Sequence, residues 1–352
     1  MKKTIRLFLA GIGVIIIVFC IPGCGSKAGG EISTETNHSH TGSPTPVYAD
    51  NDIYLVKTSA ASTNVPESYT FVWMTDTQLY SESAPEVYEA MTKWISENAD
   101  DKNIKFVFHT GDVVNQTNDS VQWLRAGVAM RSLDGSVPYS ILAGNHDLTD
   151  SGNPYENFLL HFGADRFSGR IANGDNIWFY QNGEAGAQII DTGSQNYLVL
   201  ALGVWPDEEM MAWADGILKE HSEIPAILTT HDYMNKDGTR SETGDRLFDE
   251  IVRKNPNVHL VLCGHNHNAE YRQDGLDDDN DGITDRTVYQ LLADYQETPN
   301  GGNGFMRLLT IDESEKRLTV STYSPYLDQY NCFSEAEYPG KDYFEIDISD
   351  WF

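Results

Sequence analysis

Cysteine is scarce in this 352-residue sequence, which contains four, and only Cys263 and Cys332 lie beyond the first 24 residues. At most one disulfide bond can therefore form in the main part of the chain, and an oxidising compartment would allow it. Cys263 ends the apolar run Val258–Cys263, a setting that favours a buried free thiol instead. Both outcomes stand open on the sequence alone.

Basic residues are scarce as well, with 24 Lys and Arg against 53 Asp and Glu, for a net charge of −29. A surface this acidic repels polyanions, because nucleic-acid affinity depends on Lys and Arg side chains that neutralise phosphates. Long nucleic acids are therefore poor candidate partners, whereas a small phosphorylated substrate attracted by a local metal charge is compatible with this balance. The hydrophobic content of 40% is typical of a packed soluble core and argues against global disorder.

The apolar run Leu7–Cys20 follows a basic start and is short, at about 14 residues, for a membrane-spanning helix. This order of features predicts a secretory signal peptide over residues 1–23. Ile21–Cys24 resembles a bacterial lipobox that would place a lipid anchor on Cys24, although Pro22 departs from the small or hydroxylated residue usual there. An ordinary cleaved signal and an uncleaved anchor are the alternatives. All three predict an extracytoplasmic protein, either a cell-membrane lipoprotein or a secreted one.

Residues 24–68 are rich in Gly, Ser, Thr, Asn and Pro and lack a sustained apolar period, so we expect a flexible tether. His38 and His40 lie in this solvated segment, and we do not assign them to a metal site.

From residue 69 to the end, short apolar runs alternate with amphipathic segments, which predicts one α/β domain with helices outside the sheets. The expected strands are Tyr69–Met74, Lys105–His109, Tyr139–Leu142, Ala187–Ile190, Tyr197–Leu202, Ala226–Leu228 and His259–Leu262. The expected helices are Pro85–Asn98, Val121–Ser132, Asp207–His221 and Arg240–Val252. Later strands around Arg286–Leu292, Phe305–Ile311 and Arg317–Thr322 would complete a second sheet.

Five polar clusters each follow directly after one of these apolar runs. They contain Asp76 and Gln78, Asp112, Asn145 with His146 and Asp147, His231, and His265 with His267. If the strands are parallel, their carboxyl ends meet at one edge of the sheet, where open α/β sheets place ligands. Carboxylate, carboxamide and imidazole groups bind divalent first-row metals without any thiolate. The clusters therefore predict a centre for two metal ions, which can orient a phosphate.

The ordered set D-x-(H/Q), G-D-x-x-(D/N), G-N-H-D, H and G-H-x-H resembles the calcineurin-like metallophosphoesterase family over roughly residues 69–323. The resemblance implies an α/β sandwich of two central mixed β-sheets flanked by helices. It implies a first metal held by Asp76, Gln78, Asp112 and His267. Asp112 would bridge to a second metal completed by Asn145, His231 and His265.

The same resemblance implies the chemistry. A hydroxide bridging the two metals would attack phosphorus in line, His146 would protonate the leaving group, and Asp147 would orient the His146 ring. The family's first motif usually ends in His rather than Gln78, and its second usually ends in Asp rather than Asn115. The two ions could be Mn, Fe, Mg or Zn. A neutral amide oxygen at position 78 is a harder ligand than imidazole, so it favours a more loosely held first metal, or Mn or Mg rather than Zn or Fe there.

An acidic segment, residues 277–285, has the spacing of the first part of a calcium loop. Asp277, Asp279, Asp281 and Asp285 occupy its positions one, three, five and nine, and Gly282 permits the sharp turn. The twelfth position is Val288 rather than a bidentate Glu, so a solvated acidic hairpin is the alternative. Because the loop follows closely after His267, we expect a calcium ion there to brace the wall of the site.

Together these features predict a metal-dependent hydrolase of phosphomonoesters or phosphodiesters. A non-catalytic surface lipoprotein that uses the same fold for binding is the alternative, and a nuclease is a third. We expect segments 151–193 and 294–304 to set the specificity, the second as either a lid or a turn. His109 is expected to be a core histidine beneath the site, and His161, His221 and His259 to be structural.

Overall fold

The computed structural model describes residues 68–150 and 152–352. The predicted signal peptide, Cys24, the tether, His38 and His40 lie outside the described residues. Among the helices that are described, none combines the length and the apolar character needed to cross a membrane.

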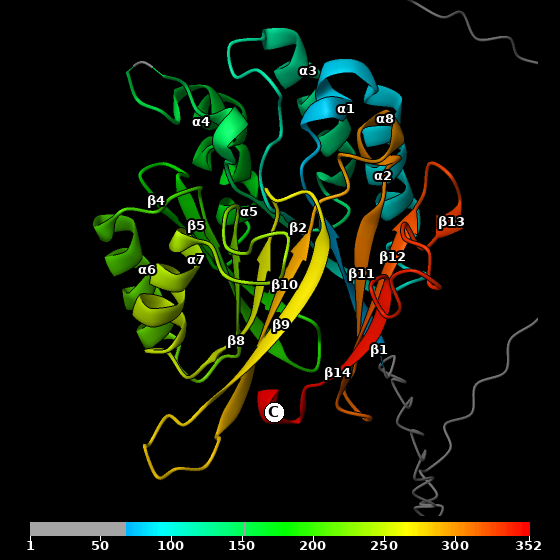
Figure 1. Cartoon of the computed structure of the whole chain (residues 1–352). Coiled ribbons are helices and arrows are strands. Elements are labelled where there is room, and N and C mark those ends of the chain that lie inside the picture. The colour runs from blue at the N-terminus through cyan, green and yellow to red at the C-terminus, as the bar shows by residue number, and fades with distance from the viewer. Residues whose placement is uncertain (1–67, 151) are drawn as a thin grey trace, which may run out of the picture. The chain divides into compact units, whose positions relative to one another are not determined.

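Two mixed β-sheets form the centre of the domain (Figure 1), and the predicted fold class is confirmed. The first sheet has the order β13-β12-β11-β1-β2-β3, with β14 also paired to β12. Its strands are β1 (Ser68–Met74), β2 (Ile104–His109), β3 (Tyr139–Ile141), β11 (Met306–Asp312), β12 (Arg317–Ser324), β13 (Gln329–Tyr330) and β14 (Tyr343–Asp347). The second sheet has the order β4-β5-β6-β7-β8-β10-β9. Its strands are β4 (Ile177–Tyr180), β5 (Ala185–Asp191), β6 (Asn196–Leu202), β7 (Ala226–Thr230), β8 (Val258–Cys263), β9 (Ala269–Leu276) and β10 (Arg286–Ala293).

Each sheet contains a parallel group of strands, β1-β2-β3 in the first and β6-β7-β8-β10 in the second. Parallel neighbours need a crossover connection, and helices supply several of these crossovers. The helices are α1 (Gln78–Ser83), α2 (Pro85–Glu97), α3 (Ser120–Met130), α4 (Glu156–Phe162), α5 (Ser168–Ala172), α6 (Glu208–Glu220), α7 (Glu242–Leu247) and α8 (Pro299–Gly302). A π-helical turn over Phe248–Val252 extends α7 to the predicted end of that helix.

Alternation along the buried strands separates two hydrophobic clusters. In β1, Phe71 and Trp73 contribute to the cluster that both sheets share, while Val72 and Met74 contribute to the cluster that includes the helices. Successive side chains of a strand point to opposite faces, so a strand buried on both sides is apolar throughout. This double burial explains why the strands appeared in the sequence as continuous apolar runs.

Several elements were not predicted. Segment 151–193 contains α4, α5, β4 and the whole of β5, and of these the sequence predicted only the part of β5 from Ala187 to Ile190. Phe158, Phe162 and Phe167 anchor this segment in the core, but their spacing forms no complete helical or strand period. The hydrophobic pattern alone was therefore too weak to reveal these elements, which depend on tertiary contacts.

The glycine-rich part of segment 294–304 is a turn and not a lid. It forms α8, and Gly304 donates its N–H to the hydroxyl of Tyr80 in α1 at 3.0 Å. A Cβ atom at Gly302 would collide with the same hydroxyl, which explains glycine at this position. These contacts fix the segment against α1.

Cys263 and Cys332, the two cysteines among the described residues, are free thiols, so the disulfide between them is wrong in this structure. Cys263 is buried in the cluster that includes the helices, whereas Cys332 packs against the cluster between the sheets. The sheet that contains Cys263 therefore separates the two side chains.

The acidic segment 277–285 connects β9 to β10, whose residues pair from Leu276 and Arg286 to Ala269 and Ala293. His267 lies just before β9, at the other end of these eight-residue strands. Eight residues of strand span about 26 Å, and in Figure 1 the hairpin loop projects at the bottom, at the opposite end from α1. The prediction that an ion in this loop braces the wall of the site is therefore wrong.

Candidate metal centre

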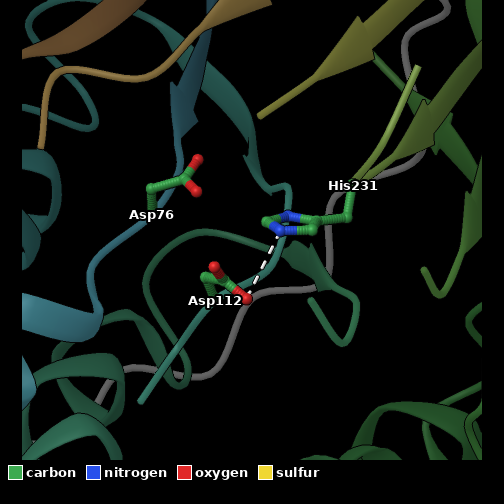
Figure 2. Close-up of side chains that lie close together, drawn as sticks. All are labelled: Asp76, Asp112 and His231. Carbon is green, nitrogen blue, oxygen red and sulfur yellow. Dashed lines mark ion pairs between the residues drawn. The ribbon is translucent and has the colours of Figure 1, made fainter. Parts of the chain in front are cut away.

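All five predicted clusters lie at the carboxyl ends of parallel strands, as expected. They do not share one sheet, however. The clusters after β1, β2 and β3 come from the first sheet, whereas His231 follows β7 and His265 follows β8 in the second. Figure 2 shows that Asp76, Asp112 and His231 nevertheless point toward one another, and their ligand atoms lie within 4.8 Å of one another. The centre therefore joins the two sheets.

The backbone at three of the candidate ligands adopts a left-handed conformation. The φ angles are 48° at Asp76, 52° at Asp112 and 72° at His265. Such angles are uncommon for residues other than glycine and cost about 1–3 kcal/mol each, so they persist only where surrounding contacts impose them. Here Asp76 donates its N–H to the carbonyl of Gly111 at 3.1 Å, and His265 donates its N–H to the Asp76 carboxylate at 3.2 Å. Three of the residues that would bind metal therefore have backbone conformations that their surroundings must impose.

Two motif glycines are required by close approach rather than by their own φ angles. A Cβ atom at Gly144 would collide with Oδ1 of Asp112, and one at Gly264 would collide with Oδ2 of Asp76. Each glycine therefore leaves the space that a ligand carboxylate from another strand occupies.

Three of the predicted ligands converge on Nε2 of His231, itself the fourth. This atom lies 3.1 Å from Oδ1 of Asn145, 3.2 Å from Nδ1 of His265 and 3.3 Å from Oδ1 of Asp112. Nδ1 of His231 is 2.8 Å from the carbonyl oxygen of Thr110, which can only accept a hydrogen bond. That contact places a proton on Nδ1 and directs Nε2 toward the centre, as in metal-binding histidines. These residues are the set predicted for the second metal.

The first-metal residues lie on the other side of Asp112. Gln78 begins α1 and donates from Nε2 to Oδ2 of Asp112 at 3.1 Å. Its Oε1 is buried and has no partner among the described residues, which leaves the atom able to bind a cation. The ring of His267 contacts Glu297 at 2.7 Å through Nδ1, and its Nε2 lies 3.8 Å from Asp294. Because 3.8 Å is beyond hydrogen-bond distance, Nε2 is the ring nitrogen left for a metal.

His146 is exposed, as a group that must reach a substrate has to be, but Asp147 does not orient its ring. Nδ1 of His146 lies 3.0 Å from the carbonyl oxygen of Asn115 instead. The Asp147 carboxylate is fully buried and accepts the N–H groups of Val113, Val114 and Gly144 at 2.8–3.1 Å. The predicted role of Asp147 is therefore wrong. Its oxygens accept hydrogen bonds from backbone N–H groups of the loops after β2 and β3, and these bonds connect the two loops.

Three polar residues directly after β10 were missed as site residues. Asp294 is buried, Gln296 hydrogen-bonds Gln78 at 2.8 Å, and Glu297 contacts His267. A signal was present, since Asp294 follows the apolar strand β10 as Asp76 follows β1. The segment had been assigned to substrate specificity instead.

Trp205 is a further residue near the centre that the sequence analysis did not identify. Its indole N–H donates to Asp232, the residue next to His231, at 3.1 Å.

His109 is buried and contacts Thr77 and Tyr88, and burial lowers its pKa to about 3, as expected for a neutral core histidine. His161, His221 and His259 contact the rings of Trp123, Trp178 and Trp351 in turn, away from the centre.

The electrostatics of the centre favour a bound cation. Burial and the neighbouring Asp294 carboxylate raise the pKa of Asp76 well above its usual range, and burial also raises the pKa of Asp294. Burial opposes the charge on His231, but Asp112 and Asp76 outweigh it and raise the pKa of His231 to about 10. Burial alone would raise the pKa of Asp112, yet His231 holds it below its ordinary value. Burial disfavours the charged forms of Asp76 and Asp294, and a divalent ion would stabilise these carboxylates in their ionised form.

Comparison with known proteins agrees with this geometry. The family model described as calcineurin-like phosphoesterase matches residues 69–269. The chain belongs to the calcineurin-like phosphoesterase family. A Bacillus subtilis protein described as uncharacterized protein YvnB is 43% identical over 283 residues, which are 80% of this chain but only 22% of that protein.

Solved structures also resemble this chain. A purple acid phosphatase from yellow lupin seeds aligns with a TM-score of 0.52 at 16% identity and covers 81% of this chain and 55% of its own, so it shows the shared fold. A dimetal phosphatase from Danio rerio aligns with a TM-score of 0.46 at 12% identity over 80% of this chain and 99% of its own.

We predict that metal binding releases protons. With a pKa of about 10, His231 is protonated at pH 7, whereas an ion needs the bare Nε2 atom, so affinity should rise with pH from about 6 to 9. Calorimetric titration with Mn²⁺ in buffers of different ionisation enthalpy should show a net release of about one proton or more. His161→Ala should keep this release and His231→Ala should reduce it. An affinity that does not change with pH would contradict the prediction.

Proposed function

We propose that this chain is a metal-dependent phosphoesterase that hydrolyses small phosphomonoesters or phosphodiesters at a two-ion centre. The observation that supports it most directly is the convergence of Asp112, Asn145 and His265 on Nε2 of His231, beside the unpaired Oε1 of Gln78. Two divalent cations held there would lower the pKa of a water molecule and neutralise charge on the phosphoryl oxygens. Family membership supports the reaction class.

The chain's own residues have separable roles in this proposal. Asp112, between the two ligand sets, would contact both ions. His146 would transfer a proton to the leaving group through Nε2, because the carbonyl of Asn115 holds its Nδ1. Asp147 would keep the loops that carry Asp112 and His146 in register through its backbone hydrogen bonds.

The non-catalytic alternative drew on Gln78 and Asn115, the two departures from the family pattern. Neither departure removes a function in this geometry, because Gln78 supplies an oxygen and Asn115 acts through its backbone carbonyl. A degenerate binder should carry one ion or none, whereas the proposed enzyme should carry close to two. The acidic surface disfavours a nuclease, and assays on single-stranded and duplex DNA would test that alternative.

We predict that purified protein with Mn, Fe, Mg or Zn hydrolyses generic aryl phosphomonoesters or diesters. His146→Ala should lower kcat by about 10²–10⁴-fold and change KM little, because it removes proton transfer but no predicted metal ligand. Asp112→Ala should abolish both turnover and metal loading. His161→Ala, a histidine outside the centre, should behave as wild type. If no metal gives turnover that Asp112→Ala abolishes, the proposed activity is wrong.

We also propose that the hairpin loop after β9 binds calcium. Carboxylate oxygens of Asp277, Asp279 and Asp285 lie within 4.8 Å of one another. Calcium should then raise the melting temperature without changing turnover, since the loop is distant from the metal centre. Asp279→Asn should remove the shift and Asp237→Asn, in another exposed loop, should keep it. A melting temperature that does not change with calcium would support the alternative, a solvated acidic hairpin.

Export and lipid attachment rest on residues 1–24 and stay proposals. If Cys24 is lipidated, the wild-type protein in a bacterial host should partition with membranes and incorporate labelled fatty acid. Cys24→Ser should lose the label. An unlabelled wild-type protein in the soluble extracytoplasmic fraction would instead support an ordinary cleaved signal.

A further inference from the structure

The amide of Gln78 can bind a metal only through its oxygen, so its orientation decides whether Gln78 can serve as a ligand of the first metal. The two faces of an amide group differ, because the NH₂ donates hydrogen bonds and the carbonyl oxygen accepts them. Nε2 of Gln78 donates to Oδ2 of Asp112 at 3.1 Å and to Oε1 of Gln296 at 2.8 Å. With both contacts on the nitrogen, Oε1 is the atom left unpaired in the buried centre.

The orientation of Gln296 is fixed in turn by Asp294. Oδ1 of Asp294 accepts the backbone N–H of Gln296 at 2.9 Å, and Oδ2 accepts the side-chain Nε2 at 3.1 Å. A carboxylate only accepts, so Gln296 must turn its NH₂ toward Asp294 and its oxygen toward Gln78. Asp112 imposes the same polarity from the other end, because it also accepts from Gln78. The two carboxylates therefore specify both amide orientations.

We propose that Gln296 and Asp294 are positioning residues of the first metal site, which hold Gln78 with its oxygen toward the ion. The inference rests on the proposed two-ion function. Oδ2 of Asp294 also lies 3.8 Å from Nε2 of His267, so this buried carboxylate acts on Gln78 through Gln296 and lies beside a second residue predicted for the first metal. Loss of Gln296 would leave the Nε2 of Gln78 with Asp112 alone as its acceptor, so the amide oxygen would be held less firmly toward the ion.

The direct test is stepwise Mn²⁺ binding, measured by calorimetry and by metal analysis after dialysis. Gln296→Met keeps the side-chain length but removes both polar atoms. It should weaken one of the two ions by about 10–100-fold, the usual effect of removing a group that orients a metal ligand, and leave the other within about threefold. Gln188→Met is the matched control, since Gln188 is another buried glutamine, whose Nε2 donates to the carbonyl of Tyr139 in β3. It should bind both ions as wild type does.

A double-mutant cycle separates positioning of Gln78 from a general structural role. Gln78→Met removes the ligand oxygen, so adding Gln296→Met to it should cost less than about threefold further. Equal losses in the two backgrounds, or wild-type affinity for both ions in Gln296→Met, would overturn the inference. A wild-type protein that binds no ions would instead overturn the two-ion function on which the inference rests.

Discussion

The contact between Asp112 and His231 is the interaction on which the rest of the centre depends. Asp112 follows β2 in the first sheet and His231 follows β7 in the second, and both side chains are almost completely buried. A buried carboxylate is unfavourable unless it is paired and hydrogen-bonded. Asp112 satisfies this condition through His231, the amide of Gln78 and the backbone N–H of His146. Electrostatic pairing therefore connects the two sheets at the same point where the ligands gather.

Much of the surrounding sequence pattern follows from this crowding. Left-handed backbone at Asp76 and Asp112 turns each carboxylate sharply off its strand. Gly144 and Gly264 leave the space that those carboxylates fill, and Asp147 joins the two loops through backbone hydrogen bonds. The fold supplies the free energy that keeps such strained, charged groups together, because the hydrophobic clusters on both faces of each sheet hold the strand ends in place.

The sequence predicted the parts of the fold that have a strong local signal. Buried parallel strands appear as continuous apolar runs, so β1, β2, β7 and β8 could be located together with the polar residues at their ends. Elements that depend on tertiary contacts could not be located, such as α1, which begins within a ligand motif at Gln78. The role of Asp147 could not be predicted from the sequence either, because its partners are backbone N–H groups, which do not depend on the side chains of the residues that carry them. Nor could local spacing show that 277–285 lies at the distant end of a hairpin.

The departures at Gln78 and Asn115 acquire a physical explanation once their contacts are considered. A neutral amide at position 78 adds no charge to a centre that already contains Asp76, Asp112 and Asp294, all buried. An amide can turn its NH₂ instead of its oxygen toward the ion, however, so it needs neighbours of defined polarity. Gln296 and Asp294 have that polarity.

Asn115 contacts His146 through its carbonyl oxygen, while its side chain donates to Glu82 at 2.8 Å. Its side-chain identity can therefore change without removing the contact that holds the His146 ring, and the two departures are compatible with the proposed activity.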